Sequence, residues 1–381
     1  MKLSSDRILT THVGSLPRPQ HLREMLMARE AGETVDAVTF EAEVRKGVDE
    51  VVRRQVAAGL DVVSDGEMSK ISYATYVKDR FSGFAGEGRS RGAQDLLDYR
   101  EYARHLVQIG GTIPSASGPI CQGPIRLEDR RPLETDIANF QAAVAAHPPV
   151  EGFLNAASPG VVSVFLENQH YPSHEVYLEA LAEVLTQEYR AIVEAGFLLQ
   201  IDCPDLAMGR HLAHADKTLE SFRGLAAQHI EVLNAAVAGL PPEALRLHLC
   251  WGNYEGPHHH DVPLSQIIDI VLKARVMAIS LEGANPRHEH EWEVFQETAL
   301  PDDKVLLPGV IDSTSNFIEH PRLVAQRIRR YADVVGRERV IASADCGFAT
   351  FAGYPNVFPE IAWAKLGALV EGAAIASEML W

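Results

Sequence analysis

The sequence predicts an α/β protein, folded as a single (βα)8 TIM barrel with an irregular excursion after the second barrel strand. Short apolar runs of strand length alternate with longer runs of helical periodicity along nearly the whole chain. Most of the apolar runs end in a polar or charged residue, often next to a glycine. The 381 residues are enough for one large barrel, and we see no convincing domain boundary. We therefore expect one domain over residues 1–381.

Eight apolar runs are expected to form the barrel strands. They cover residues 8–13, 60–64, 150–156, 198–201, 245–250, 279–282, 305–310 and 340–344. Their polar tips are Ser15, Glu67, Ser158, Asp202, Cys250, Glu282, Asp312 and Cys346. The carboxyl ends of the strands hold the active site in a TIM barrel, so we expect the site among these tips. A ninth run, 124–127, adjoins the glycine-rich stretch 84–123 and is placed outside the barrel, with that stretch as a lid or hairpin excursion.

Helical periodicity is strongest in four further segments, at residues 40–58, 173–195, 219–238 and 322–335, and it recurs at 136–146. Gly196 follows the second of these segments and is expected to end that helix in a left-handed conformation. Strands and helices thus follow one another in the order that a parallel barrel requires.

Composition limits the partners and the compartment. The formal net charge of −17 would repel nucleic acid and anionic membranes. The first residues have no apolar signal segment, and the most apolar run, 368–376, is interrupted by Glu371. Four cysteines in a chain of this length do not make a disulfide framework. We expect a cytoplasmic protein that binds small molecules, and the sequence leaves a homo-oligomer open.

His248 and Cys250 stand two residues apart at the end of an apolar run. In a strand they would point the same way, roughly 7 Å apart. Imidazole and thiolate together suit zinc, although a lone His-x-Cys pair on a strand is more often part of the core. Glu282 and Cys346 also stand at the ends of apolar runs. One His, two Cys and one Glu, each at a strand tip, would complete a zinc site.

These tips belong to a longer series of motifs. In order they are Thr10-Thr11-His12-Val13-Gly14-Ser15, Gly66-Glu67, Gln200-Ile201-Asp202, His248-Leu249-Cys250, Leu281-Glu282, Gly309-Val310-Ile311-Asp312 and Asp345-Cys346-Gly347. The series resembles the catalytic C-terminal domain of cobalamin-independent methionine synthase and its single-domain relatives, which include epoxyalkane:coenzyme M transferase. The resemblance implies zinc ligands at His248, Cys250, Glu282 and Cys346. It implies homocysteine-binding positions at Val13, Ser15, Glu67 and Asp202, and catalytic roles for Glu282 and Asp312.

The activity that the resemblance implies is zinc-dependent S-alkyl transfer, with methyl transfer to the thiol of homocysteine in methionine biosynthesis. The partners would be a small-molecule thiol and an alkyl donor. Two departures from the family pattern argue against 5-methyltetrahydrofolate as that donor. Residues 161–168 contain no Trp where the family stacks its folate, and Ser313-Thr314 stands where the family has a His.

Three alternatives stay open at this point. The first is alkyl transfer to another thiol such as coenzyme M, although two carboxylates at Glu67 and Asp202 favour a substrate with an amino group. The second is a zinc hydrolase, and the third is a barrel with purely structural zinc. Taken alone, either carboxylate is more simply a helix cap or a satisfied loop acid. The run 258–260 is expected to be a solvated histidine loop, and the segment 288–290 to lie at the surface.

Overall fold

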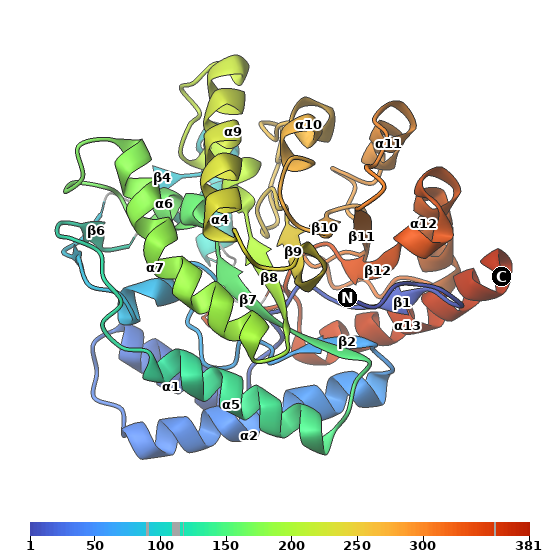
Figure 1. Ribbon diagram of the computed structural model, residues 1–381, viewed down its shortest axis with the longest axis horizontal. Coiled ribbons are helices and arrows are strands. Elements are labelled where there is room, and N and C mark those ends of the chain that lie inside the picture. Colours follow the sequence, from blue (N-terminus) through green and yellow to red (C-terminus); the bar gives the residue numbers. More distant parts are fainter. Residues whose placement is uncertain (89–90, 109–114, 117, 354–355) are drawn as a thin grey trace. The chain divides into compact units, whose positions relative to one another are not determined.

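The computed structural model describes residues 1–88, 91–108, 115–116, 118–353 and 356–381. Among them, eight strands form one parallel sheet in the order β1-β12-β11-β10-β9-β8-β7-β2 (Figure 1). The strands are β1 (Leu9–Thr10), β2 (Val62–Ser64), β7 (Glu151–Ala157), β8 (Leu198–Asp202), β9 (Leu245–His248), β10 (Ala278–Leu281), β11 (Val305–Ile311) and β12 (Ile341–Ala344). The two end strands of this order meet where the Asp61 N–H donates to the Thr10 carbonyl at 3.1 Å. The sheet is a nearly closed barrel, which confirms the predicted fold class.

Each of the eight predicted runs overlaps one of these strands. The ninth run, 124–127, is not a strand, since Leu127 forms only an isolated bridge with Phe81. Strand β9 ends at His248, two residues before the end of its predicted run. Cys250 therefore lies in the loop that follows the strand rather than on the strand itself.

The described residues pack into two compact units. The first unit comprises Met1–Tyr73, Leu133–Asn155 and Ala278–Trp381, and the second comprises Ala74–Pro132 and Ala156–Met277. That the whole chain is one domain stays a prediction.

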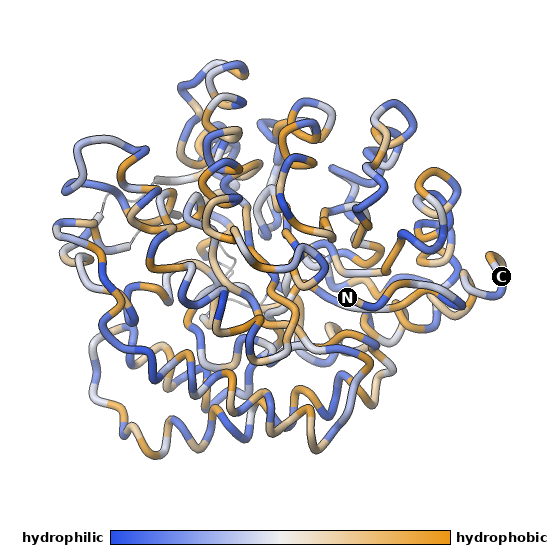
Figure 2. Tube along the Cα trace, in the orientation of Figure 1, coloured by the Kyte–Doolittle hydropathy of each residue, from blue (hydrophilic) through white to orange (hydrophobic). Residues whose placement is uncertain are grey.

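The first unit contains β1, β2, most of β7 and the run from β10 to β12. Its helices are α1 (Gln20–Glu30), α2 (Ala37–Ala58), α11 (Val294–Glu297), α12 (Pro321–Val335), α13 (Pro359–Leu380) and nearly all of α5 (Arg131–Ala146). Asp36 caps α2 by accepting the Thr39 N–H at 2.9 Å, and Gly59, with φ of 89°, ends it. Hydrophilic and hydrophobic residues alternate along α2 and α5 in Figure 2, as expected for helices with one buried face.

Helix α13 was not predicted as an element, because its apolar residues follow one another too closely to give a clear stripe. It packs on α12, where a Cβ at Gly372 would lie 2.4 Å from the Val324 Cβ. Only glycine allows this approach. Among the described residues, no helix is long and apolar enough to cross a membrane.

The second unit contains the parallel strands β8 and β9. Its helices are α3 (Gln94–Asp98), α4 (Arg100–Gln108), α6 (Pro159–Phe165), α7 (His174–Glu194), α8 (Gly209–Leu212), α9 (Leu219–Ala236) and α10 (Ile268–Val271). Ser173 caps α7 by accepting the Val176 N–H at 3.2 Å. Gly196 lies just past the end of α7 with φ of 91°, as its position in the sequence predicts.

The predicted excursion after the second barrel strand consists of short elements. Strand β3 (Phe84–Ala85) pairs with β6 (Ile120–Cys121), and β4 (Arg91–Gly92) pairs with β5 (Ser115–Ala116), both antiparallel. Helices α3 and α4 lie between the two halves of the β4–β5 pair in sequence. Residues 89–90, 109–114 and 117 of the predicted stretch lie outside the described residues.

Two of the expected surface histidines are buried. His258, expected in a solvated loop, is 5% exposed, and His288 is 2% exposed. His288 Nδ1 lies 2.7 Å from a Glu291 carboxylate oxygen. A polar run in the sequence does not show which of its residues will be covered by a neighbouring element. The prediction of an exposed position was therefore wrong for His258 and for His288.

Candidate metal and substrate site

The second unit places three of the expected site residues together. Asp202, the last residue of β8, is the register partner of His248, the last residue of β9. Cys250 follows two residues later, and its sulfur accepts the Gly252 N–H at 3.2 Å. Gly252 has φ of 113°, a conformation that favours glycine and turns the chain directly after Cys250. The barrel strands thus bring a carboxylate, an imidazole and a thiol to neighbouring positions.

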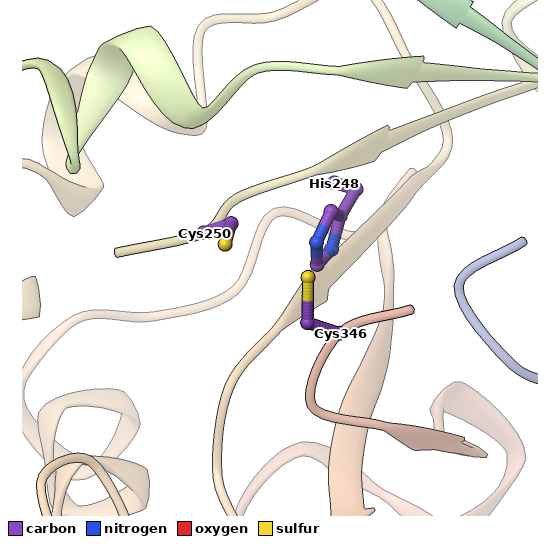
Figure 3. Close-up of side chains that lie close together, drawn as sticks. All are labelled: His248, Cys250 and Cys346. Carbon is purple, nitrogen blue, oxygen red and sulfur yellow. The ribbon is translucent and has the colours of Figure 1, made fainter. Parts of the chain in front are cut away.

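Cys346 follows β12 and supplies a second thiol. His248, Cys250 and Cys346 each offer one ligand atom, and these atoms all lie within 4.8 Å of one another. Figure 3 shows the side chains of this group. All three residues are buried, and none of the cysteines forms a disulfide. One nitrogen and two sulfur donors are a set that zinc accepts, with a fourth position left for an exchangeable ligand.

Glu282 is outside this group of three among the described residues. One of its carboxylate oxygens accepts hydrogen bonds from Arg287 at 2.6 Å and from the Asn285 side chain at 2.7 Å. The Glu282 side chain is only 1% exposed, so these donors stabilise a buried negative charge. Glu282 as the fourth zinc ligand stays a prediction.

Asp345 holds the loop that follows Glu282. Its carboxylate accepts the backbone N–H groups of Gly283, Ala284 and Asn285, each at 2.8 Å, and the Asn285 amide at 2.7 Å. Burial raises the pKa of Asp345 to about 7, the nearby charges of Glu282 and Asp312 add to the rise, and the loop N–H donors oppose it. The Asp-Cys-Gly motif points to Asp345, whereas nothing in the sequence pointed to Asn285 or Arg287.

Asp312 lies in the loop after β11. Its carboxylate accepts hydrogen bonds from the Thr314 N–H at 2.9 Å and the Thr314 hydroxyl at 2.8 Å. Burial works against ionisation, yet the bonds from Ser315 and Thr314 and the charge of Lys365 hold the pKa of Asp312 below its usual value. Asp312 is thus a fixed, ionised acceptor, and its catalytic role stays a prediction.

The first unit gathers the other expected substrate residues. A Cβ at Gly347 would lie 2.0 Å from the Ser15 hydroxyl, so Ser15 lies directly against the residue that follows Cys346. The Asn155 side-chain amide donates to the Val13 carbonyl at 2.8 Å, and the Leu16 N–H donates to the Gly66 carbonyl at 3.1 Å. These contacts bring the Val13–Ser15 turn next to the turn that carries Glu67.

Glu67 has an uncommon backbone conformation, with φ of 56°. Positive φ is costly for a residue with a side chain and is retained mainly at functional sites. Buried Arg18 supports the turn, since its guanidinium donates twice to the Glu67 carbonyl, at 2.8 and 3.1 Å, and once to the Lys70 carbonyl at 2.8 Å. Burial lowers the pKa of Arg18, and the negative charges of Glu67 and Asp65 oppose that change.

The fold and the strand-end residues define a barrel enzyme with a thiol-rich candidate metal site. The family model described as "Cobalamin-independent synthase, Catalytic domain" matches residues 8–93 and 103–370. A methionine synthase of Saccharolobus solfataricus is 26% identical over 374 residues, covering 97% of this chain and 95% of that protein. A methionine synthase of Sulfolobus acidocaldarius is 26% identical over 373 residues, covering 97% and 93%.

A solved structure has the same fold. It is the B12-independent methionine synthase from Shewanella sp. W3-18-1 in complex with selenomethionine, with a TM-score of 0.74 at 20% identity, covering 98% of this chain and 99% of that one. The chain therefore belongs to the cobalamin-independent methionine synthase family, as its sequence motifs indicated, and it is a methyltransferase of that family.

Proposed function

We propose that the chain transfers a methyl group to the thiol of homocysteine at a zinc ion held by His248, Cys250 and Cys346. The observation that carries the proposal is the meeting of one imidazole and two thiols within 4.8 Å at the ends of barrel strands. A zinc ion bound there would lower the pKa of a coordinated substrate thiol, so that the thiol is held as the more nucleophilic thiolate.

The protein's own residues would recognise the rest of the substrate. Asp202 lies beside His248 as its register partner, and its carboxylate accepts the Gln200 amide at 2.8 Å. Asp202 and Glu67 are 3% and 2% exposed, and together they would hold the substrate ammonium group. The Val13–Ser15 turn would offer N–H groups and a hydroxyl to the substrate carboxylate.

Glu282 is the zinc ligand that the substrate sulfur is expected to replace. Arg287 and Asn285 already hold its carboxylate, so it has partners when it does not bind metal. This arrangement lowers the cost of exchanging Glu282 for a substrate sulfur.

Two buried carboxylates favour an amino-thiol over a thiol that carries a sulfonate. A sulfonate beside Glu67 and Asp202 would face negative charge in a site with little water to screen it. The ammonium group of homocysteine would instead form a favourable contact with the same two carboxylates.

Replacement of a ligand tests the proposal. Cys346→Ser is expected to lose the zinc ion held by these three residues, because the ligands bind the ion cooperatively. Cys203→Ser is the matched control, since Cys203 is also buried but lies outside the group of three. Equal zinc content in the two variants and the wild type would refute the assignment.

Spectroscopy tests the substrate. Zinc-edge X-ray absorption of the wild-type holoenzyme should gain one sulfur neighbour when homocysteine is added. A spectrum that does not change on adding homocysteine would indicate structural zinc and rule out the transferase proposal. The methyl donor is then sought by offering methylfolate and methylcobalamin with homocysteine and measuring methionine.

A further inference from the structure

A second group of metal-ligand side chains lies within the second unit and contains no cysteine. His211 is on helix α8, and His258 and Asp261 are in the loop after β9; one ligand atom of each lies within 4.8 Å of the others. His211 Nδ1 is 3.2 Å from Asp261 Oδ1, and His258 Nδ1 is 3.0 Å from Asp261 Oδ2. The two imidazole side chains are 1% exposed and the Asp261 side chain 8% exposed. This trio is named the histidine–aspartate cluster.

The contacts of Tyr254 determine where the imidazole protons lie. The Tyr254 hydroxyl donates to the buried Asp95 carboxylate at 2.7 Å, and the same carboxylate oxygen accepts the backbone N–H of His258 at 3.0 Å. With its proton directed at Asp95, the Tyr254 hydroxyl can only accept from His211 Nε2, which lies 3.4 Å away. His258 Nε2 faces the Tyr254 carbonyl at 3.1 Å, and a carbonyl can only accept. Both Nε2 atoms therefore carry hydrogen.

A neutral imidazole with hydrogen on Nε2 has a lone pair on Nδ1. In the histidine–aspartate cluster, both Nδ1 atoms face the negatively charged Asp261 carboxylate. The two Nδ1 lone pairs and the carboxylate repel one another unless a cation lies between them. That cation is either a proton on each ring or a single metal ion.

Geometry and charge favour the metal ion. The two rings have centroids 6.0 Å apart, so two imidazolium charges that share the Asp261 carboxylate would repel each other in this buried place. In a tetrahedral site with bonds of about 2.0–2.1 Å, neighbouring ligand atoms are roughly 3.3 Å apart. The His211 and His258 Nδ1 atoms lie 3.2 and 3.1 Å from the same oxygen, Asp261 Oδ1, which is close to that separation. Metal-bound histidines usually donate their outer N–H to an oxygen acceptor, as both rings do here toward Tyr254.

We propose that His211, His258 and Asp261 bind a second divalent transition-metal ion, with zinc as the metal that best suits two imidazoles and one carboxylate. The backbone conformation of His258 is uncommon, as is often seen at functional sites. His258 and Glu67 are the two non-glycine residues with positive φ in the part of the chain that the structure describes, and His258 has φ of 51°. This strained conformation is one of the features that place the His258 ring against Asp261.

A neighbouring exposed group provides the control. His259 and His260 lie 3.1 and 2.7 Å from the Asp98 carboxylate, all three with exposed side chains. This group has the same residue types, with its two histidines in the same loop and Asp98 at the end of α3, but it faces solvent, where water competes for the metal. His260→Ala therefore tests whether any second ion depends on the exposed group instead.

The test measures zinc bound per chain after equilibration with zinc alone. The wild type should bind two ions, Asp261→Asn and His211→Asn one, and His260→Ala two. A wild type that binds a single ion which Asp261→Asn retains, an Asp261→Asn variant that keeps two ions, or a His260→Ala variant that loses the second ion would each overturn the proposal. Cys346→Ser should lose only the other ion, so the two metal assignments fail independently.

Cobalt titration of the wild type gives a readout that does not depend on a folded variant. One equivalent of Co²⁺ should give a thiolate-to-metal charge-transfer band from the cysteine ligands. A second equivalent should add ligand-field absorption alone, since the histidine–aspartate cluster has no sulfur. Growth of the thiolate band across both equivalents, or no second binding event, would contradict the proposal.

Discussion

Asp345→Asn tests the loop that carries Glu282. Asp345 is 1% exposed, and its two carboxylate oxygens accept two N–H groups each from Gly283, Ala284 and Asn285. An asparagine has one carbonyl oxygen and one NH₂ group, so either side-chain orientation turns a donor toward two of these four donors. Each buried donor left without an acceptor costs about 1–3 kcal/mol. We expect Asp345→Asn to destabilise the protein by about 3–5 kcal/mol.

Urea-induced unfolding at pH 8 measures this loss, since the pKa of Asp345 is raised to about 7 and the carboxylate is then ionised. The matched control is Asp303→Asn, which removes the same charge from a side chain that is 77% exposed. The Asn285 amide also donates to Glu282, so the variant should weaken zinc binding in addition. A free energy of unfolding within about 0.5 kcal/mol of the control, the usual range of surface substitutions, would refute the reasoning.

Three further predictions concern other parts of the molecule. Arg18→Lys should raise the Kd for homocysteine by about tenfold with little change in zinc content, because lysine cannot donate to all the carbonyls that fix the Glu67 turn. Isothermal titration measures this Kd. An unchanged Kd would show that the Glu67 turn keeps its conformation without these hydrogen bonds. Glu67→Ala should weaken the binding of homocysteine far more than the binding of an amine-free thiol. Equal losses of affinity for the two thiols would refute an ammonium contact at Glu67. Burial, followed by the charge of His229, lowers the pKa of His174 from 6.5 to about 4, so the stability due to neutral His174 is complete above pH 6.5 and is lost as the pH falls toward 4. For this half-buried ring we expect a loss of about 1 kcal/mol after solvent screening, measured by urea unfolding at pH 7 and pH 4.5. A variant His174→Gln with the same pH dependence as the wild type would contradict it.

The sequence alone determined the barrel strands and the types of residue at their ends. The apolar runs 198–201 and 305–310 form the strands Leu198–Asp202 and Val305–Ile311, because strand formation depends on local periodicity and on the turn residues that follow. The motifs at the same places identify the family, which the family model confirms. Local signals failed for α13, where apolar residues on all sides hide the helical stripe.

Only the tertiary structure decided which side chains meet. Asp202 becomes the register partner of His248 through the pairing of two strands that are separated by helix α9, and no local pattern encodes that register. The partners of Glu282 and the burial of His258 likewise depend on residues supplied by other segments, such as Asp345 for the Glu282 loop and Asp95 for the His258 N–H. Hydrophobic periodicity is a property of neighbouring residues, whereas a hydrogen bond or a metal site depends on distances that are fixed only when the strands and helices have packed.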